Sequence, residues 1–179
     1  AILEADARGL QNFSVYCAHK TTPPALRAIA NDPETTIDGF ILPGHVATIT
    51  GLAPFGFLVE EFKTPGVVTG FEPVDILQGI CMLVQMVVES RPAIDNAYRR
   101  GVNANGNPVA RQLVEQVFEP CDATWRGLGP IAGSGLAIRP EFSHFDASMR
   151  FDVPIEPTVE PRGCRCGDVL RGAITPSDC

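Results

Sequence analysis

The sequence predicts an α/β fold: a parallel, Rossmann-like sheet with helices on both faces, followed by an irregular segment that contains cysteines. Short apolar runs alternate with helical patterns through residues 12–118, as is typical of strands joined by crossover helices. The runs are almost continuously apolar, as expected for strands buried on both faces. After residue 150 the periodicity is lost and Pro, Gly and Cys become frequent. We therefore expect an α/β domain over residues 1–150, incomplete at its N-terminus, and a separate region over 151–179.

Three apolar runs are predicted to be the strands of this sheet: residues 12–18, 37–42 and 66–69. Each run is followed by residues typical of turns or helix starts, which include Pro or Gly, and then by a helical pattern. Parallel strands need such crossover connections, because the chain must return to the end of the sheet at which the previous strand began before the next strand can start.

Helices are predicted after the strands and at the N-terminus. The pair Pro23-Pro24, preceded by threonines, is typical of the first turn of a helix over residues 25–30. The pattern over 74–89 is apolar nearly all round, so we expect this helix to be deeply covered. The other predicted segments are the tail of a helix within residues 1–10, a helix or helical turn at 46–50, and helices at 93–100 and 108–118.

Four polar side chains lie where the predicted strands end: His19, Lys20, His45 and Glu72. The carboxyl ends of parallel strands meet at one edge of a sheet, where ligands commonly bind. Loops are often polar for no functional reason, but three consecutive strand ends with His and Lys, His and Glu indicate a shared site. Such side chains can donate hydrogen bonds or relay protons. We predict that the four residues line one cleft.

The segment from residue 123 to 140 is glycine-rich and contains the only tryptophan of the chain. It is compatible with a loop or with two strands and a bulge. Trp125 and Arg126 are residue types that are enriched at protein interfaces. A tryptophan that covers the core beside a partly buried arginine explains the pair equally well.

Three of the six cysteines lie close to the end of the chain: Cys164, Cys166 and Cys179. Thiols in a segment without a core favour a zinc or iron–sulfur site, because soft thiolates suit both. Three cysteines cannot complete a four-cysteine site. Either Cys17, Cys81 or Cys121 supplies a further ligand, which their placement disfavours, or further ligands lie beyond Cys179. An even number of cysteines also permits disulfides. Cys17 and Cys81 lie in elements predicted to be buried, however, as reduced structural thiols often do, and a reducing compartment fits better.

Charge and motif content argue against several function classes. The formal net charge is −7 and no basic stripe is present, so we do not expect nucleic-acid binding. The longest apolar stretch with a helical pattern, residues 76–88, is shorter than the roughly 20 residues of a membrane span, so we expect no membrane insertion. No Walker motif, no GxGxxG that opens a helix after a strand, no GxSxG and no HExxH occurs.

Six long motifs make the sequence resemble the HypD family of hydrogenase maturation proteins. They are FSVYCAHKTTPPAL, DGFILPGHVATITG, VVTGFEPVDIL, NAYRRGVNANGNPVA, VFEPCDATWRGLGPIAGSGL and CRCGDVLRGAITPSDC, at residues 13–26, 38–51, 67–77, 96–110, 117–136 and 164–179. The resemblance covers essentially the whole chain. Ala47 and Ala132 stand where the family pattern leads us to expect Ser and Pro.

The resemblance implies an assembly protein rather than a classical turnover enzyme: a cytoplasmic scaffold for the Fe(CN)2CO moiety of [NiFe]-hydrogenases. It implies two partners, a small HypC-type chaperone and a cyanide-donating HypE-type protein. It also implies iron and a [4Fe-4S] cluster in the full-length protein, with residues 151–179 as a linker and the start of the cluster-binding region.

The same resemblance assigns roles to the cysteines. Cys179 matches the family's PxDC motif and is the expected cluster ligand. Cys164 and Cys166 match its CxCG motif, as further ligands or as structural or redox thiols. The family's N-terminal CGGH-type and CPxC-type motifs have no counterpart in this sequence.

Two other functions are compatible with the same residues. One is a small-molecule α/β enzyme that uses the strand-end His and Glu residues and carries a structural zinc site in its tail. The other is an interaction module built round the Trp125 loop. Iron and sulfide in the purified full-length protein would favour the scaffold over the zinc-containing enzyme.

Overall fold

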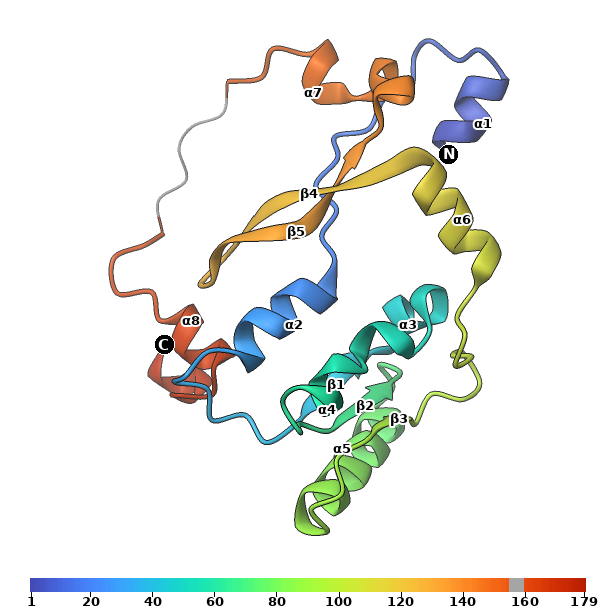
Figure 1. The fold of residues 1–179 in the computed structure, drawn as a ribbon. Coiled ribbons are helices and arrows are strands. Elements are labelled where there is room, and N and C mark those ends of the chain that lie inside the picture. Colours follow the sequence, from blue (N-terminus) through green and yellow to red (C-terminus); the bar gives the residue numbers. More distant parts are fainter. Residues whose placement is uncertain (155–159) are drawn as a thin grey trace.

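The computed structural model describes residues 1–154 and 160–179 of the chain. The linker predicted at the start of residues 151–179 therefore falls partly outside the described residues. The chain forms two lobes and a C-terminal segment (Figure 1). We call residues 22–107 the sheet lobe, residues 1–21 and 108–154 the hairpin lobe, and residues 160–179 the thiol segment.

A three-stranded parallel sheet forms the centre of the sheet lobe, which confirms the predicted α/β fold. Its strands are β1 (Phe40–Pro43), β2 (Gly66–Thr69) and β3 (Ile94–Asn96), in the order β1-β2-β3. Phe40 lies opposite Gly66, and Gly66 lies opposite Ile94. Every residue of β2 is buried, as expected for a central strand covered on both faces.

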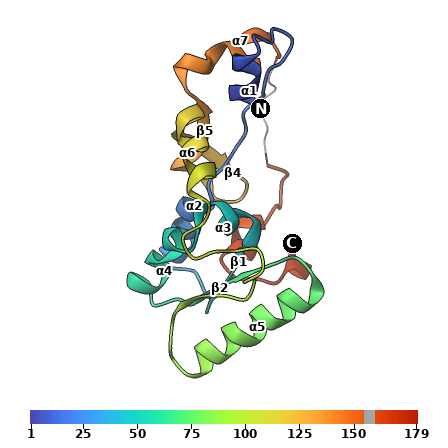
Figure 2. The same cartoon turned by 90° about the vertical axis from the view of Figure 1, so that its right-hand side faces the viewer.

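Helices lie on both faces of this sheet (Figure 2). α5 (Pro73–Val88) follows β2 and lies below the sheet in that view, while α3 (Gly44–Thr50) follows β1 and lies on the other side. The short helices η1 (Ala53–Phe55) and α4 (Phe57–Glu60) complete the crossover to β2, and α2 (Thr22–Ala30) precedes β1. Prolines occupy the first turn of α2 and α5, where a missing N–H costs no hydrogen bond.

The main hydrophobic core lies between the sheet and α2, α3 and α4. Leu42 and Val68 reach it from the sheet, and Phe55 and Leu58 reach it from the crossover; all four are fully buried. The expectation that α5 is deeply covered is wrong for one of its faces, since Val74 remains 74% exposed. Other apolar side chains of α5 that are exposed are Leu77, Ile80, Val84, Val87 and Val88. A helix can bury only the face that contacts its sheet, and this contact runs through Gly79 and Met86.

The prediction of a helix over residues 93–100 is wrong, because residues 94–96 form β3. The side chain of Asn96 explains the local difference. It donates a hydrogen bond from Nδ2 to the carbonyl oxygen of Val102, and its Oδ1 accepts one from the N–H of Tyr98. Such side-chain bonds to the backbone compete with helical ones and close a loop instead.

The hairpin lobe is built from both ends of the chain. Its antiparallel hairpin consists of β4 (Phe118–Trp125) and β5 (Gly129–Ile138), with an irregularity between Cys121 and Ala123, so residues 123–140 form the strand-and-bulge alternative. The predicted helices at 1–10 and 108–118 are α1 (Ile2–Ala7) and α6 (Pro108–Val117). Two further short helices follow, η2 (Pro140–Phe145) and α7 (Ala147–Arg150).

Residues 12–18 do not form a strand of the parallel sheet, so that prediction is wrong. Val15 makes a single bridge to Asp146, and Lys20 makes one to Gly135 of β5. The segment therefore passes from η2 to β5 in the hairpin lobe. A strand requires one partner over several consecutive residues, and here the hydrogen bonds are divided between two partners.

The thiol segment contains α8 (Cys166–Leu170) and η3 (Pro176–Asp178). It lies beside the C-terminal end of α2 (Figure 1). No residue of α8 is buried. Among the residues that the structure describes, no helix has both the length and the apolar content needed to cross a membrane.

Candidate functional site

Two of the four predicted site residues lie at the carboxyl end of the parallel sheet. His45 is in the first turn of α3, two residues after the end of β1, and Glu72 is the N-cap residue of α5, three residues after the end of β2. The imidazole of His45 packs against the exposed ring of Phe71, with 5.1 Å between ring centroids. The βα connections therefore bring this histidine and the residue beside Glu72 into contact, as the sheet topology predicts.

The guanidinium of Arg100 joins Glu72 to Asp75 at the same edge. Its Nη1 and Nη2 atoms lie 2.7 and 2.5 Å from the two carboxylate oxygens of Asp75, and Nη2 lies 2.8 Å from Oε2 of Glu72. Asp75 is only 5% exposed. The hydrogen bonds from Arg100 hold the pKa of the Asp75 carboxyl below its usual value.

Tyr98 forms the floor under Arg100, whose guanidinium lies 4.6 Å from the centre of the ring. Three glycines make room for this ring. A Cβ atom at Gly44, Gly70 or Gly101 would lie 2.8, 2.9 or 2.5 Å from ring carbons of Tyr98. The three glycines are therefore needed for close packing at the edge of the sheet.

Tyr98, Arg100 and Asp75 were not among the site residues predicted from the sequence. The signal for Tyr98 and Arg100 was position, since both follow the end of β3 as His45 follows β1 and Glu72 follows β2. Because residues 93–100 were predicted to form a helix, the end of β3 was not recognised as a third strand end. Asp75 lies in the first turn of α5 and not at a strand end, so its place in the sequence does not indicate a role in the site.

His19 and Lys20 lie in the hairpin lobe, not at the edge of the parallel sheet. Lys20 donates a hydrogen bond from Nζ to the carbonyl oxygen of Thr124, and its Nζ lies 5.2 Å from the centre of the Trp125 ring. Among the described residues, no hydrogen bond or ion pair joins either residue to His45 or Glu72. Their predicted place on a shared rim depended on a strand at residues 12–18, which the structure does not contain.

His19 has neighbours of another kind. Its Nδ1 lies 3.1 Å from the sulfur of Cys17, and its ring packs edge-on against Phe118 with 5.2 Å between centroids. It also lines an apolar groove of about 480 Å³ between α1 and α6. The sulfur of Cys17 donates a hydrogen bond to the carbonyl oxygen of Leu136, which fixes the thiol at the hairpin.

The structure brings the C-terminal cysteines together around Arg126, at the tip of the β4–β5 hairpin. Cys166 and Cys179 line one open pocket of about 520 Å³ with Arg126. The other residues of its lining are Val169, Leu170 and Pro176. The sulfur of Cys164 lies 3.9 Å from Nη2 of Arg126. Residues of two distant parts of the sequence thus share one thiol-containing pocket.

The pKa values of the two neighbouring thiols are shifted in opposite directions. The pKa of Cys164 is lowered by hydrogen bonds, first from the backbone N–H and the side chain of Cys166. The hydrogen bond from Arg126 makes a smaller contribution. The hydrogen bond to Cys164 and then burial raise the pKa of Cys166. Cys164 is therefore the more acidic thiol of the pair, chiefly because Cys166 donates hydrogen bonds to it.

The thiols fit part of an iron–sulfur site. A [4Fe-4S] cluster is held by four thiolates. All six cysteines are free, and only Cys164, Cys166 and Cys179 lie near this pocket. Within residues 1–154 and 160–179, no group of three or more His, Cys, Asp or Glu side chains is placed to hold a metal ion. The described residues therefore do not complete a cluster site by themselves.

Comparison with known proteins places the chain in a family. The HypD family model, described as "Hydrogenase formation hypA family", matches residues 1–179. The chain is 43% identical to the hydrogenase expression/formation protein HupD of Azotobacter chroococcum, and 42% identical to the hydrogenase maturation factors HypD of Cupriavidus necator and Escherichia coli. These alignments cover 98–99% of this chain and 48–49% of each relative.

The chain thus spans about half the length of the curated relatives it matches. The match includes the sheet edge with His45 and Glu72 and the thiol segment with Cys164, Cys166 and Cys179, since it covers every residue. The chain belongs to the HypD family of hydrogenase formation proteins.

Proposed function

We propose that the chain is part of a hydrogenase maturation scaffold, on which the Fe(CN)2CO moiety of [NiFe]-hydrogenases is assembled. In this proposal it acts with a HypC-type chaperone and a HypE-type cyanide donor, in the cytoplasm. The observation that carries the proposal is the family match over all of residues 1–179. The relatives named above are hydrogenase maturation or hydrogenase expression/formation proteins, which supports the process, while the iron moiety and the two partners are part of the proposal.

At the sheet edge, the iron carrying its cyanide ligands is the substrate. Cyanide nitrogens accept hydrogen bonds, and the exposed imidazole of His45 offers an N–H donor beside the ring of Phe71. Glu72 and Arg100 supply a carboxylate and a guanidinium at the same edge, held in place by Asp75. We propose that His45 binds the cyanide ligands. The network of Glu72, Arg100 and Asp75 holds the polar side chains of this edge in place.

In the thiol segment, we propose that Cys179 supplies one thiolate of an iron–sulfur cluster, with Cys166 as its neighbour in the same pocket. The remaining ligands come from outside the described residues.

A chimeric protein tests this function. In a strain of Escherichia coli without its own HypD, the matching half of that relative is replaced by this chain, and hydrogenase activity is measured. Restored activity is the expected result. An inactive chimera that folds and accumulates normally would contradict the scaffold proposal for this chain, because the remainder of the chimera is the E. coli sequence.

His45→Ala in the same chimera tests the sheet edge. We expect hydrogenase activity to fall at least about tenfold with an unchanged thermal unfolding profile, because a hydrogen bond to a charged group is worth roughly 1.5–3 kcal/mol. His144→Ala is the matched control, since His144 is half exposed in the hairpin lobe and faces Asp6. Normal activation by His45→Ala would remove this histidine from the site.

A further inference from the structure

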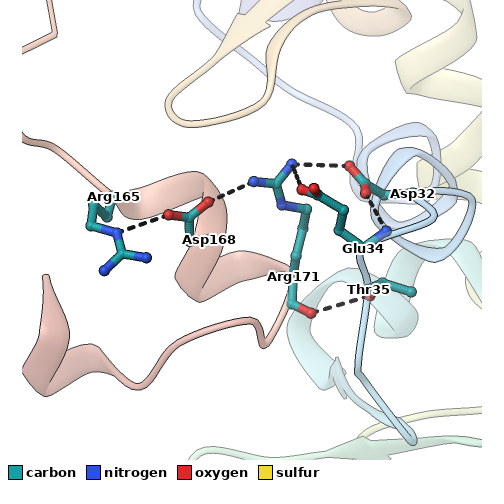
Figure 3. Close-up of polar contacts among 6 residues, drawn as sticks. All are labelled: Asp32, Glu34, Thr35, Arg165, Asp168 and Arg171. Carbon is teal, nitrogen blue, oxygen red and sulfur yellow. Dashed lines mark hydrogen bonds and ion pairs between the residues drawn. The ribbon is translucent and has the colours of Figure 1, made fainter.

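Polar contacts rather than a hydrophobic core hold the thiol segment on the sheet lobe. α8 contributes no buried residue, so burial of apolar surface does little to keep it in place. The side chain of Arg171 helps to hold the segment in place, because it extends from the end of α8 toward the loop that follows α2 (Figure 3). This loop, residues 31–36, lies far from the thiol segment in the sequence.

Arg171 forms ion pairs on both sides of this junction. Its Nη1 lies 3.2 Å from Oδ2 of Asp32 and 3.4 Å from Oε2 of Glu34, both on the loop. Its Nη2 lies 2.6 Å from Oδ1 of Asp168, one turn back on its own helix. Asp168 is held in turn by Arg165, whose Nε lies 2.9 Å from Oδ2 (Figure 3).

The Arg171 pairs with Asp32 and Asp168 differ from ordinary surface ion pairs in their burial, whereas Glu34 is 71% exposed. The side chains of Arg171, Asp32 and Asp168 are 24%, 27% and 30% exposed, whereas that of Arg165 is 49% exposed. Exposed pairs contribute little because water and salt screen them, and partly buried pairs are screened much less. Arg171 is also the residue that bridges the loop and α8.

The backbone at Arg171 makes the same connection. The carbonyl oxygen of Arg171 accepts hydrogen bonds from the N–H of Thr36, at 2.9 Å, and from the hydroxyl of Thr35, at 3.3 Å. The hydroxyl of Thr36 donates to the carbonyl oxygen of Gly172 at 2.8 Å. The last carbonyls of a helix have no partner within the helix, so the loop satisfies groups that α8 leaves open.

A second contact holds the start of α8 against the hairpin tip. The backbones of Gly127 and Gly167 approach so closely that a Cβ on Gly127 would lie 2.6 Å from the nitrogen of Gly167. Cys166 precedes this contact, and Cys179 follows the junction at Arg171. The position of the two cysteines around their shared pocket therefore depends on both ends of α8.

We infer that Arg171 is the positioning residue of the thiol site: by joining α8 to the loop after α2, it places Cys166 and Cys179 in one pocket. This role does not depend on the metal or on the partners proposed above. It predicts that loss of the Arg171 side chain separates the two thiols while both lobes remain folded.

The test measures how readily the two thiols can be bridged. Dibromobimane becomes fluorescent when it links two neighbouring thiols, and it is applied to the chain in a Cys164→Ser background, so that Cys166 and Cys179 are the thiols left at the pocket. Peptide mass spectrometry identifies the linked pair. For Arg171→Gln we expect bridging to slow by about tenfold, which corresponds to a loss of roughly 1.4 kcal/mol of docking free energy.

Two variants serve as comparisons. Arg165→Gln removes the exposed partner of Asp168 and should leave bridging nearly unchanged. Arg171→Lys keeps the charge but lacks the planar group that reaches several carboxylates, so it should give an intermediate rate. Amide hydrogen exchange at Thr36 should accelerate in Arg171→Gln along with the loss of bridging, while the thermal unfolding of the lobes stays the same.

Equal bridging rates and equal Thr36 exchange in the original chain and in Arg171→Gln would overturn the inference. Should Arg171→Gln unfold the whole chain, Asp32→Asn replaces it. This change removes one carboxylate charge from the loop and leaves the thiol segment as it is. It should slow bridging in the same direction, and an unchanged rate in that variant would also overturn the inference.

Discussion

At the scale of single residues, the edge of the parallel sheet depends on a few close contacts. Tyr98 fits because Gly44, Gly70 and Gly101 have no Cβ atoms, and Arg100 lies over its ring. Asp75 then receives two hydrogen bonds from Arg100 in a nearly buried position. A carboxylate in such surroundings contributes to stability only while it is ionised.

The Asp75 carboxylate makes stability depend on pH in acid. Its pKa is lowered in the folded chain, chiefly by Arg100, so its contribution is complete above the pKa of an unfolded aspartate, about 3.9. The contribution disappears as the pH falls through the lower, folded-state value. In urea unfolding, we expect Asp75→Asn to be less stable than the original chain at pH 7, with the difference shrinking below about pH 4.

Asp152→Asn is the control for the lost charge, because Asp152 is exposed. Its unfolding free energy should follow that of the original chain across the same pH range. A difference between Asp75→Asn and the original chain that stayed constant from pH 7 to pH 3 would show that ionisation of Asp75 is not the cause.

At the scale of elements, α5 shows how one face of a helix is selected. Gly79 lies where the helix crosses Thr69 of β2, and a Cβ there would come within 2.2 Å of the Thr69 Cγ2 atom. The helix can approach the sheet closely only because this position lacks a side chain. The opposite face, with Val74, Leu77 and Val84, is exposed although it is equally apolar.

Gly79→Ala should therefore destabilise the chain, although alanine is the better helix former by about 1 kcal/mol. The added methyl group overpacks the contact with Thr69, and overpacking typically costs about 1–3 kcal/mol. Thr69→Ser removes the methyl group that clashes. In that background, we expect Gly79→Ala to cost less or to stabilise, as measured by urea unfolding of all four proteins. Equal effects in both backgrounds would rule out this contact as the cause.

At the scale of the whole molecule, two separate clusters of buried residues support the two lobes. The cluster in the hairpin lobe is assembled from both ends of the chain, with Ile2 and Ala5 of α1 packed with Ile138 and Phe145. Phe145 is 2% exposed and also contacts the ring of Phe13, with 5.9 Å between centroids. The second lobe thus forms only when the N-terminal residues return to the hairpin.

Phe145→Ala should lower the free energy of unfolding by about 3–5 kcal/mol, the usual cost of removing a buried phenylalanine ring. Phe151→Ala is the matched control, since Phe151 is 53% exposed and lies six residues later on the same lobe. It should change stability by less than about 0.5 kcal/mol. Thermal unfolding followed by circular dichroism measures both, and similar values for the two variants would mean that this cluster contributes little.

Local sequence was sufficient for the elements with a strong pattern of their own. β1, β2, α2, α5 and α6 agree with the predicted segments because prolines mark their starts or apolar runs mark their extent. The positions of His45 and Glu72 at the carboxyl end of the sheet were predictable for the same reason, as both lie in the turn after a predicted strand. The clustering of three cysteines near the end of the chain is visible in the sequence itself.

Contacts between distant residues decided the remainder. The run at 12–18 resembles a strand in its residues, but its bridge, at Val15, is to Asp146 after η2, and no local pattern encodes a partner. β3 was hidden because three residues are too few for a periodicity, and its pairing with β2 is what makes it a strand. Arg100, Asp75 and Arg171 are charged residues of ordinary appearance whose importance comes from the groups they meet.

The sequence by itself determined the α/β class, the family and the residue types available for chemistry, because these depend on composition, periodicity and long motifs. Only the tertiary structure decided which of those residues share a site. It separates His19 and Lys20 from His45 and Glu72, and it places Arg126 beside the C-terminal cysteines. The physical reason is that a site requires residues to be close in space, and packing between lobes brings residues together irrespective of their separation along the chain.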